Sequence, residues 1–217
     1  MVKAYVILIF LFCDAVYCKA IDSTSTYQDH FSIALEHYNE KRYKLAEFEF
    51  KKILIERKSF SDPVSHIMLA KSQYFQNKII ESNRTCNSFL NKYPKSKYEL
   101  DVRILLADNF IKQEKYSNVI EQLLLVRSGV KDSILQKNID HRIVSSIMIG
   151  ISSNKIERLL FSSENRFDRS ILNLARSYRS LLDGNMKEME LSLSVIDADL
   201  ISYQYKKLYD GLNLFIG

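Results

Sequence analysis

An internal repeat limits the folds open to this chain more than any other feature of its 217-residue sequence. Ala34 recurs as Ala70 and again as Ala107, which lie 36 and then 37 residues further along. A repeat of this length is one supersecondary unit that buries its apolar face only by stacking on its neighbours. Small, aromatic and aliphatic side chains follow in the same order in three copies: Ala34, Tyr38, Tyr43, Ala46, Phe50, Ile53, Leu54; Ala70, Tyr74, Ile79, Ser82, Cys86, Phe89, Leu90; and Ala107, Ile111, Tyr116, Val119, Leu123, Val126.

Each copy predicts a helical hairpin. In the first copy, residues 31–38 and 43–54 carry apolar side chains three and four positions apart, the period of a helix rather than a strand, on either side of polar residues 39–42. Small residues such as Ala46 allow the two helices to approach closely, and large ones such as Phe50 fill the space toward the next hairpin. Five glycines and two prolines are too few for the turns of an all-β fold.

The repeat signature fades at Asp132 although the helical period continues. A fourth, degenerate hairpin is predicted from Ile143, Ile147 and Ile151, followed by Ile156, Leu159 and Leu160, with a polar break at 162–166. We therefore divide the chain into residues 1–20, three well-marked hairpins in 21–131, and degenerate hairpins with a final helix in 132–217.

The end of the chain predicts one more hairpin and a single helix. Residues 171–182 and 186–196 are helical in pattern, and Asp183-Gly184-Asn185 between them is a strong turn signal. Residues 200–215 form a last helix that we expect to cap the stack. The predicted fold is all-α: a right-handed superhelical stack of helical hairpins, or α-solenoid, with about five hairpins plus the C-terminal helix.

Residues 29–127 resemble tetratricopeptide repeats (TPR). The usual turn glycine is replaced by Lys41, Lys78 and Glu114, whereas the repeat's small and aromatic positions are filled by Ala34, Tyr43, Ala46 and Phe50. Residues 89–96 (FLNKYPKS) are similar to the hairpin ends of bacterial envelope proteins, such as the outer-membrane assembly lipoprotein family (BamD-like) and the Tol-Pal coordinator family. The resemblance implies a scaffold that binds other proteins.

The first 20 residues have the pattern of a secretory signal peptide. Lys3 is followed by the apolar run Ala4–Cys13, and the small residues Cys18 and Ala20 suit the −3 and −1 positions of a signal-peptidase site, which predicts a mature chain that starts near Ile21. This apolar run is shorter than the roughly 20 residues that span a bilayer. The alternative is a buried N-terminal helix.

Cysteine usage follows from that cleavage. A start near Ile21 leaves Cys86 alone, so the exported chain has no internal disulfide, and we expect this thiol to be buried between hairpins. Cleavage before Cys18 instead would place a lipid on that cysteine, although Tyr17 stands where lipobox sequences carry a small residue. Membrane attachment is expected only in the lipidated form.

No motif points to catalysis, a metal or a cofactor. Residues 150–154 (GISSN) lack the closing glycine of a nucleophile elbow, and there is no phosphate-binding glycine loop, H-E-x-x-H or paired C-x-x-C. His30, His37 and His66 would bind a metal only if the fold brought them together; the alternative is surface histidines. Acids two apart, such as Glu47 and Glu49, are interpreted as solvated. The net charge of +5 is spread among mixed charges, without a nucleic-acid arm.

The TPR resemblance implies that the first helix of each hairpin lines a concave groove. Aromatic, cationic and amide side chains on such helices suit an extended peptide or a partner helix. The alternative for Tyr38 and Tyr74 is a role in hairpin packing alone. The predicted partner-binding residues are Tyr38, Asn39, Lys71, Tyr74, Phe75, Asp108 and Lys112.

These observations predict a non-catalytic periplasmic adaptor that binds protein or peptide partners in envelope assembly or maintenance. The apolar end of the chain, residues 212–217, keeps a second hypothesis open: the N-terminal helical module of a penicillin-binding-protein activator or of a substrate-binding fusion. A third is the superhelix of a lytic transglycosylase, whose separate catalytic domain does not fit within 217 residues.

Overall fold

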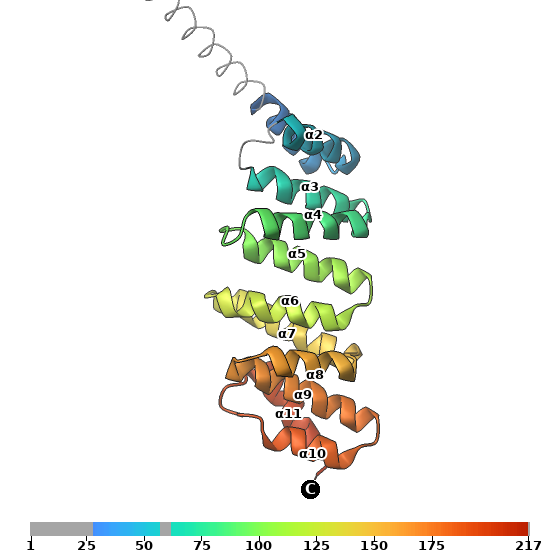
Figure 1. Ribbon diagram of the computed structural model, residues 1–217, viewed down its shortest axis with the longest axis vertical. Helices are drawn as coiled ribbons and strands as arrows, with labels where there is room; N and C mark the ends of the chain where they lie inside the picture. Colours follow the sequence, from blue (N-terminus) through green and yellow to red (C-terminus); the bar gives the residue numbers. More distant parts are fainter. Residues whose placement is uncertain (1–27, 57–61, 217) are drawn as a thin grey trace, which may run out of the picture. The chain divides into compact units, whose positions relative to one another are not determined.

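The computed structural model describes residues 28–56 and 62–216, and every regular element in these ranges is a helix (Figure 1). The prediction of an all-α fold built from helical hairpins is confirmed. The predicted signal peptide, its cleavage near Ile21 and the lipid at Cys18 lie outside the described residues. Residues 28–39 are helical, and the helices that follow are α2 (Tyr43–Glu56), α3 (Pro63–Phe75), α4 (Ile79–Lys92), α5 (Glu99–Lys112), α6 (Tyr116–Gly129), α7 (Ser133–Ile149), α8 (Ser153–Ser162), α9 (Arg166–Leu182), α10 (Met186–Ser194) and α11 (Tyr203–Asn213).

The chain forms two compact units, divided between Tyr93 and Pro94. In unit 1, the part up to Tyr93, α2 packs on α3 and α3 packs on α4. In unit 2, from Pro94 onward, α5 packs on α6, α6 on α7, α8 on α9, and α9 on α10. The boundary after residue 131, where the repeat signature fades, falls inside unit 2 and stays a prediction. Among the described helices, none has the length and apolar character needed to cross a bilayer.

The hairpin turns depend on residues in the left-handed backbone conformation. Lys41 (φ 60°), Asn77 (φ 61°) and Glu114 (φ 57°) occupy this position in the first three hairpins, and Gly184 (φ 71°) occupies it between α9 and α10. The second turn therefore uses Asn77 rather than Lys78, which the repeat alignment suggested. Asparagine tolerates this conformation better than lysine does.

The core of unit 1 follows the repeat register. Phe50 is fully buried and its ring meets that of Phe31 edge to face, with 6.0 Å between the centroids. Cys86 is buried as predicted, and burial raises the pKa of its thiol to about 12, so the thiol is unreactive at neutral pH. His66 lies against the rings of Phe89 and Tyr93, at centroid distances of 6.4 and 5.6 Å.

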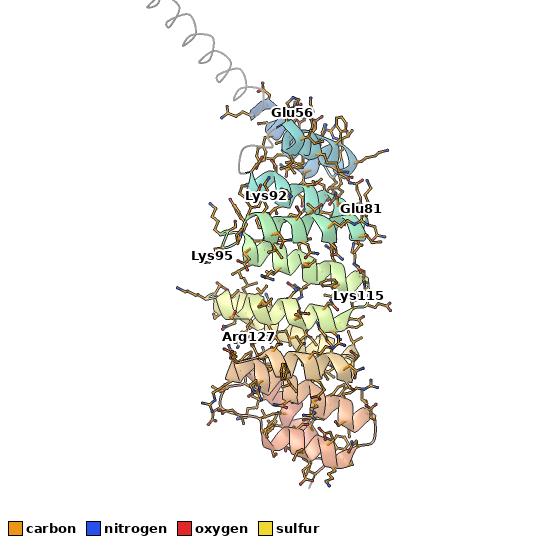
Figure 2. All side chains as sticks on the ribbon, in the orientation of Figure 1. Glu56, Glu81, Lys92, Lys95, Lys115 and Arg127 are labelled. Carbon is orange, nitrogen blue, oxygen red and sulfur yellow. The ribbon has the colours of Figure 1, made fainter. Side chains whose placement is uncertain are left out.

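The interpretation of Glu47 as a solvated acid is wrong. Its side chain is only 4% exposed, and it accepts hydrogen bonds from Lys51 on α2, from Gln76, which follows α3, and from Lys78 at the start of α4. Burial alone would raise the pKa of this carboxyl, but the hydrogen bonds outweigh burial and lower the pKa to about 2. Charged side chains such as Glu56, Glu81 and Lys115 stand on the outside of the helices instead (Figure 2).

The last helix of unit 2 does not form a cap on the preceding hairpin, as the sequence suggested. It packs across α7 and α9, and its regular part, Tyr203–Asn213, is shorter than the predicted 200–215. Tyr205 and Leu212 belong to the apolar core of unit 2, which explains why this helix is more apolar than an exposed cap would be. The polar break at 162–166 is confirmed, because α8 ends at Ser162 and α9 begins at Arg166.

Candidate functional site

Four aromatic side chains meet in unit 1 where the helix at 28–39 faces α3. The ring of Phe75 stacks on that of Tyr43 at 4.8 Å and meets Tyr38 and Tyr74 edge to face, at 6.0 and 5.3 Å between centroids. Tyr38 also meets Tyr43 at 5.5 Å. We call Tyr38, Tyr43, Tyr74 and Phe75 the aromatic cluster. Phe75 is 50% exposed, so the cluster presents apolar surface to solvent.

The structure brings together three of the predicted partner-binding residues, Tyr38, Tyr74 and Phe75. Lys71 precedes Tyr74 and Phe75 by three and four positions, so it lies on the same side of α3 and is partly exposed. Asn39 is exposed and ends the helix at 28–39. Sequence reasoning missed Tyr43, because its place at a repeat packing position hid its contact with Phe75.

Tyr38 both packs and faces solvent. It is half-buried, and burial followed by the neighbouring Tyr43 raises the pKa of its phenol, which therefore stays protonated at neutral pH. Its hydroxyl is a hydrogen-bond donor and acceptor beside an apolar ring surface. The two interpretations of Tyr38, hairpin packing and partner contact, are thus compatible.

The remaining predicted residues, Asp108 and Lys112, lie on α5 in unit 2. Asp108 forms an ion pair with Arg142 of α7, which links the first helices of two successive hairpins. Burial raises the pKa of the Asp108 carboxyl, while Arg142 and then Lys112 act in the opposite direction. A partner that used Asp108 would compete with Arg142.

Helix α11 packs on α7 and α9, two of the first helices of unit 2. Tyr205 is fully buried, and its hydroxyl donates a 3.1 Å hydrogen bond to Oδ1 of Asp140 on α7. The ring of Tyr205 meets the ring of Phe167 of α9 edge to face, with 5.7 Å between the centroids. The guanidinium carbon of Arg127 lies 3.5 Å from the centroid of the Phe167 ring. Arg127 also pairs with Asp140, so this buried carboxylate is neutralised. A tyrosine-bearing helix thus fills this face.

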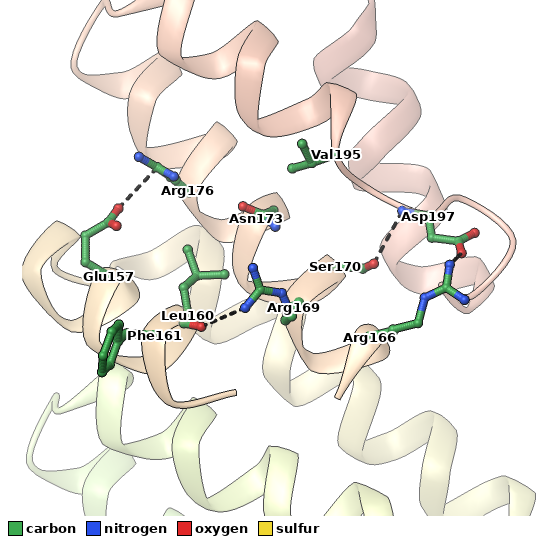
Figure 3. Close-up of a pocket in the computed structure, with 10 residues that line it drawn as sticks. All are labelled: Glu157, Leu160, Phe161, Arg166, Arg169, Ser170, Asn173, Arg176, Val195 and Asp197. Atoms are coloured by element: carbon green, nitrogen blue, oxygen red, sulfur yellow. Dashed lines mark hydrogen bonds and ion pairs between the residues drawn. The ribbon is translucent and has the colours of Figure 1, made fainter. Parts of the chain in front are cut away.

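A second candidate site is the cleft between α8, α9 and the segment after α10 (Figure 3). Its volume is about 640 Å³, within the range of small-molecule pockets. One face of α9 supplies most of the polar lining, with side chains spaced three and four residues apart. The sequence analysis did not predict this cleft, although polar residues recur along α9 at the same spacing between apolar ones. The lining residues are Glu157, Leu160, Phe161, Arg166, Arg169, Ser170, Asn173, Arg176, Val195 and Asp197.

The arginines of this cleft differ in their partners. Arg166 pairs with Asp197 at 2.9 Å. Arg176 pairs with Glu157 of α8 at 3.1 Å and also with Glu188 of α10. Arg169 instead donates to two backbone oxygens, those of Leu160 at 3.1 Å and Ser163 at 3.3 Å.

The histidines and acids of the described residues offer no metal centre, since no group of three ligand-type side chains converges there. His30 lies 3.2 Å from both Oε2 of Glu49 and Nζ of Lys52, which occupies its two ring nitrogens. His66 packs among rings in another part of unit 1. The hypothesis that His30, His37 and His66 share a metal therefore gains no support from their surroundings.

No family model matches the sequence, and no curated protein is detectably similar to it. Among solved structures, the chain is similar to MamA from MSR-1, with 13% identity over 88% of this chain and 99% of that chain and a TM-score of 0.48. MamA from AMB-1 gives 12% identity, coverage of 88% and 97%, and a TM-score of 0.48. A thermophilic TPR protein in Thermus thermophilus gives 18% identity, coverage of 88% and 83%, and a TM-score of 0.34.

Proposed function

We propose that this chain is an exported, non-catalytic scaffold of the cell envelope that binds a protein partner at the aromatic cluster of unit 1. The single observation that carries the proposal is the half-exposed ring of Phe75, packed among three tyrosines. Tyrosine and other aromatic side chains supply much of the binding energy at the centres of protein interfaces. A stacked and edge-packed ring is also held in place before a partner arrives, which lowers the entropic cost of binding.

Unit 2 supports a helix as the partner. Its own first helices α7 and α9 hold α11, and Tyr205 of α11 is the largest fully buried side chain of the described chain. The same type of surface in unit 1 carries aromatic rings that remain in contact with solvent. An amphipathic helix with aromatic anchors suits such a surface, because three- and four-residue spacing places its anchors on one side.

The proposed cellular location is supported by the sequence alone. Residues 1–20 have the order of charged, apolar and small residues that directs export, and residues 89–96 resemble hairpin ends of envelope proteins. We place the mature chain in the periplasm, with attachment to the outer membrane if Cys18 carries a lipid. N-terminal sequencing of the envelope fraction tests this placement, and an intact Met1 on a cytoplasmic protein would contradict it.

Photo-crosslinking in the native host tests the binding site. A photoreactive amino acid in place of Lys71, beside the aromatic cluster, should capture a partner that mass spectrometry identifies. The purified partner should then bind the double variant Tyr38→Ala/Phe75→Ala at least about tenfold more weakly than it binds the original chain. Phe48→Ala is the matched control, because Phe48 is a 64% exposed ring on α2 outside the cluster. Equal losses in both variants, or no loss in the folded double variant, would sink the proposal.

A further inference from the structure

Helix α9 carries a polar stripe on the face that it turns toward α8. Arg166, Arg169, Ser170, Asn173 and Arg176 lie on one face, and all of them line the cleft beside α8 (Figure 3). The rest of the helix is buried in the core of unit 2 through Ile171, Leu172, Leu174 and Ala175. An amphipathic helix normally turns its polar face to open solvent, whereas this one turns it into a cleft between helices.

Asn173 is a nearly buried polar residue of the cleft. The residue is only 7% exposed, and within residues 28–56 and 62–216 its side-chain amide has no hydrogen-bond partner. The amide atoms themselves are still within reach of solvent, so a ligand in the cleft can replace water as their hydrogen-bond partner. Asn173 follows Arg169 by four residues, about one turn of α9, and both residues line the cleft (Figure 3). A ligand atom between these two groups would satisfy both.

The charges of the cleft favour a monoanion. Arg166 pairs with one acid and Arg176 with two, but Arg169 donates to neutral backbone oxygens, and no carboxylate among the described residues pairs with it. Both backbone hydrogen bonds of Arg169 come from Nη1, so the Nε and Nη2 side of its guanidinium remains for a ligand. When Glu188, the second partner of Arg176, is counted, three carboxylates stand against three guanidinium groups, so the positive charge that remains unpaired is local to Arg169. One carboxylate can pair with Arg169, whereas a phosphate dianion would bring excess negative charge into the cleft.

The walls of the cleft are apolar on the side of α8. Leu160 lies next to the polar stripe, and Phe161 is 94% exposed at the rim. Val195, 61% exposed, lines the cleft from the end of α10. An exposed phenylalanine ring gains from contact with an apolar group, because that contact removes both surfaces from water.

We infer that the cleft between α8 and α9 binds a small carboxylate that carries an apolar group. Arg169 and the Asn173 amide hold the carboxylate through charge-assisted hydrogen bonds. Leu160, Phe161 and Val195 contact the apolar group. This site is independent of the aromatic cluster, which lies in unit 1.

The test is a titration of the full mature chain, labelled with ¹⁵N, with phenylacetate as the probe. The amide resonances of α8 and α9 should shift and saturate. Phenylacetamide has the same shape without the charge and should bind at least about tenfold more weakly, because a charge-assisted hydrogen bond to arginine is lost. Binding of the two probes with equal affinity would overturn the inference, and so would an absence of shifts with phenylacetate.

Two variants and two controls locate the contact. Arg169→Gln should weaken phenylacetate binding at least about tenfold, and Asn173→Asp should abolish it, because the new carboxylate repels the probe at almost unchanged shape. Arg158→Gln, an exposed arginine of α8 outside the cleft, should leave the affinity unchanged. Circular dichroism establishes that each variant is folded. Inorganic phosphate is the second control, and tighter binding of phosphate than of phenylacetate would overturn the choice of a carboxylate.

Discussion

The two units carry aromatic residues on the same kind of surface with opposite outcomes. In unit 1, Phe75 of α3 is packed by three tyrosines yet remains 50% exposed. In unit 2, the ring of Phe167 on α9 contacts the ring of Tyr205 on α11 edge to face, and Tyr205 is fully buried. Both surfaces lie mainly on the first helices of hairpins, with Tyr43 of α2 added in unit 1. The difference is that a helix of the chain itself covers one of them.

This comparison shows that repeat position does not decide whether an aromatic residue belongs to the core or to a binding surface. Covering the face with α11 turns Tyr205 and its partner Asp140 into parts of the folded core, where the hydroxyl and the carboxylate must be satisfied. The aromatic cluster of unit 1 has no such requirement, so its rings are available for a partner at a small cost in stability. Each prediction below tests one side of this contrast.

The largest effect is expected for Tyr205→Ala, which should lower the free energy of unfolding of unit 2 by about 3 to 5 kcal/mol. The substitution leaves a cavity and removes the donor to Asp140. Residue-resolved hydrogen exchange measures this loss of unfolding free energy. Amides of α7 and α9 should lose protection, while those of α2 and α3 should keep theirs. Tyr205→Phe, which keeps the ring, should cost about 1 to 2 kcal/mol. A loss below about 1 kcal/mol for Tyr205→Ala would mean that α11 is only loosely attached.

The next effect concerns Glu47, which links α2 with both helices of the following hairpin. Glu47→Gln should destabilise unit 1 by about 2 to 3 kcal/mol at neutral pH, less than the pKa shift alone implies because Lys51 and Lys78 are half exposed. The folded-state pKa of about 2 lies below the ordinary 4.5, so this stabilisation is complete above pH 4.5 and disappears as the pH falls toward 2.

Urea unfolding of the chain and of the Glu47→Gln variant at several pH values measures that contribution. The two curves should converge as the pH approaches 2. Glu81→Gln, an exposed acid of α4 in the same unit, is the control and should cost about 0.5 kcal/mol or less at any pH. A difference that stays constant with pH would show that Glu47 acts through its shape rather than through its charge.

The sequence predicted those parts of the fold that depend on neighbours within one repeat. Phe50 and Cys86 are buried because the repeat register alone places them between helices. Glu47 was misjudged because the partners that bury it, Gln76 and Lys78, lie 29 and 31 residues away in the next hairpin. Tyr205 was missed for the same reason, since Asp140 lies 65 residues before it.

The same reasoning separates the two candidate sites. Tyr38, Tyr74 and Phe75 could be named in advance because the first helices of successive hairpins stack side by side. The contact between the two helices joins Tyr38 to Phe75, the residue after its repeat equivalent Tyr74. The stripe on α9 was visible as a periodic pattern, but a polar face on a helix is ordinarily solvated. Only the position of α8 and of the segment after α10 turns that face into a cleft.

A smaller effect on stability, with a large effect on binding, is expected for Phe75→Ala. Because the ring is half exposed, its loss should cost unit 1 only about 1 kcal/mol of unfolding free energy. Partner affinity should nevertheless fall at least about tenfold. Urea unfolding and a binding titration measure the two quantities on the same sample. A stability loss as large as that of Tyr205→Ala would place Phe75 in the core and remove the contrast between the units.

The smallest effect is expected for Lys71→Ala, which should change the unfolding free energy by about 0.5 kcal/mol or less. Lys71 lies at the edge of the aromatic cluster and is partly exposed, so it acts on a partner over a distance rather than through desolvated contact. Charges at such positions mainly raise the association rate, and salt screens them within about 10 Å at 0.1 M. Association measured by stopped flow should therefore slow in Lys71→Ala at low salt and match the original chain at high salt. Lys44→Ala, an exposed lysine at the start of α2, should slow association less. If Lys71→Ala abolishes binding at every salt concentration, the lysine and not the rings is the centre of the interface, and the aromatic cluster of unit 1 is then a packing feature like the buried rings of unit 2.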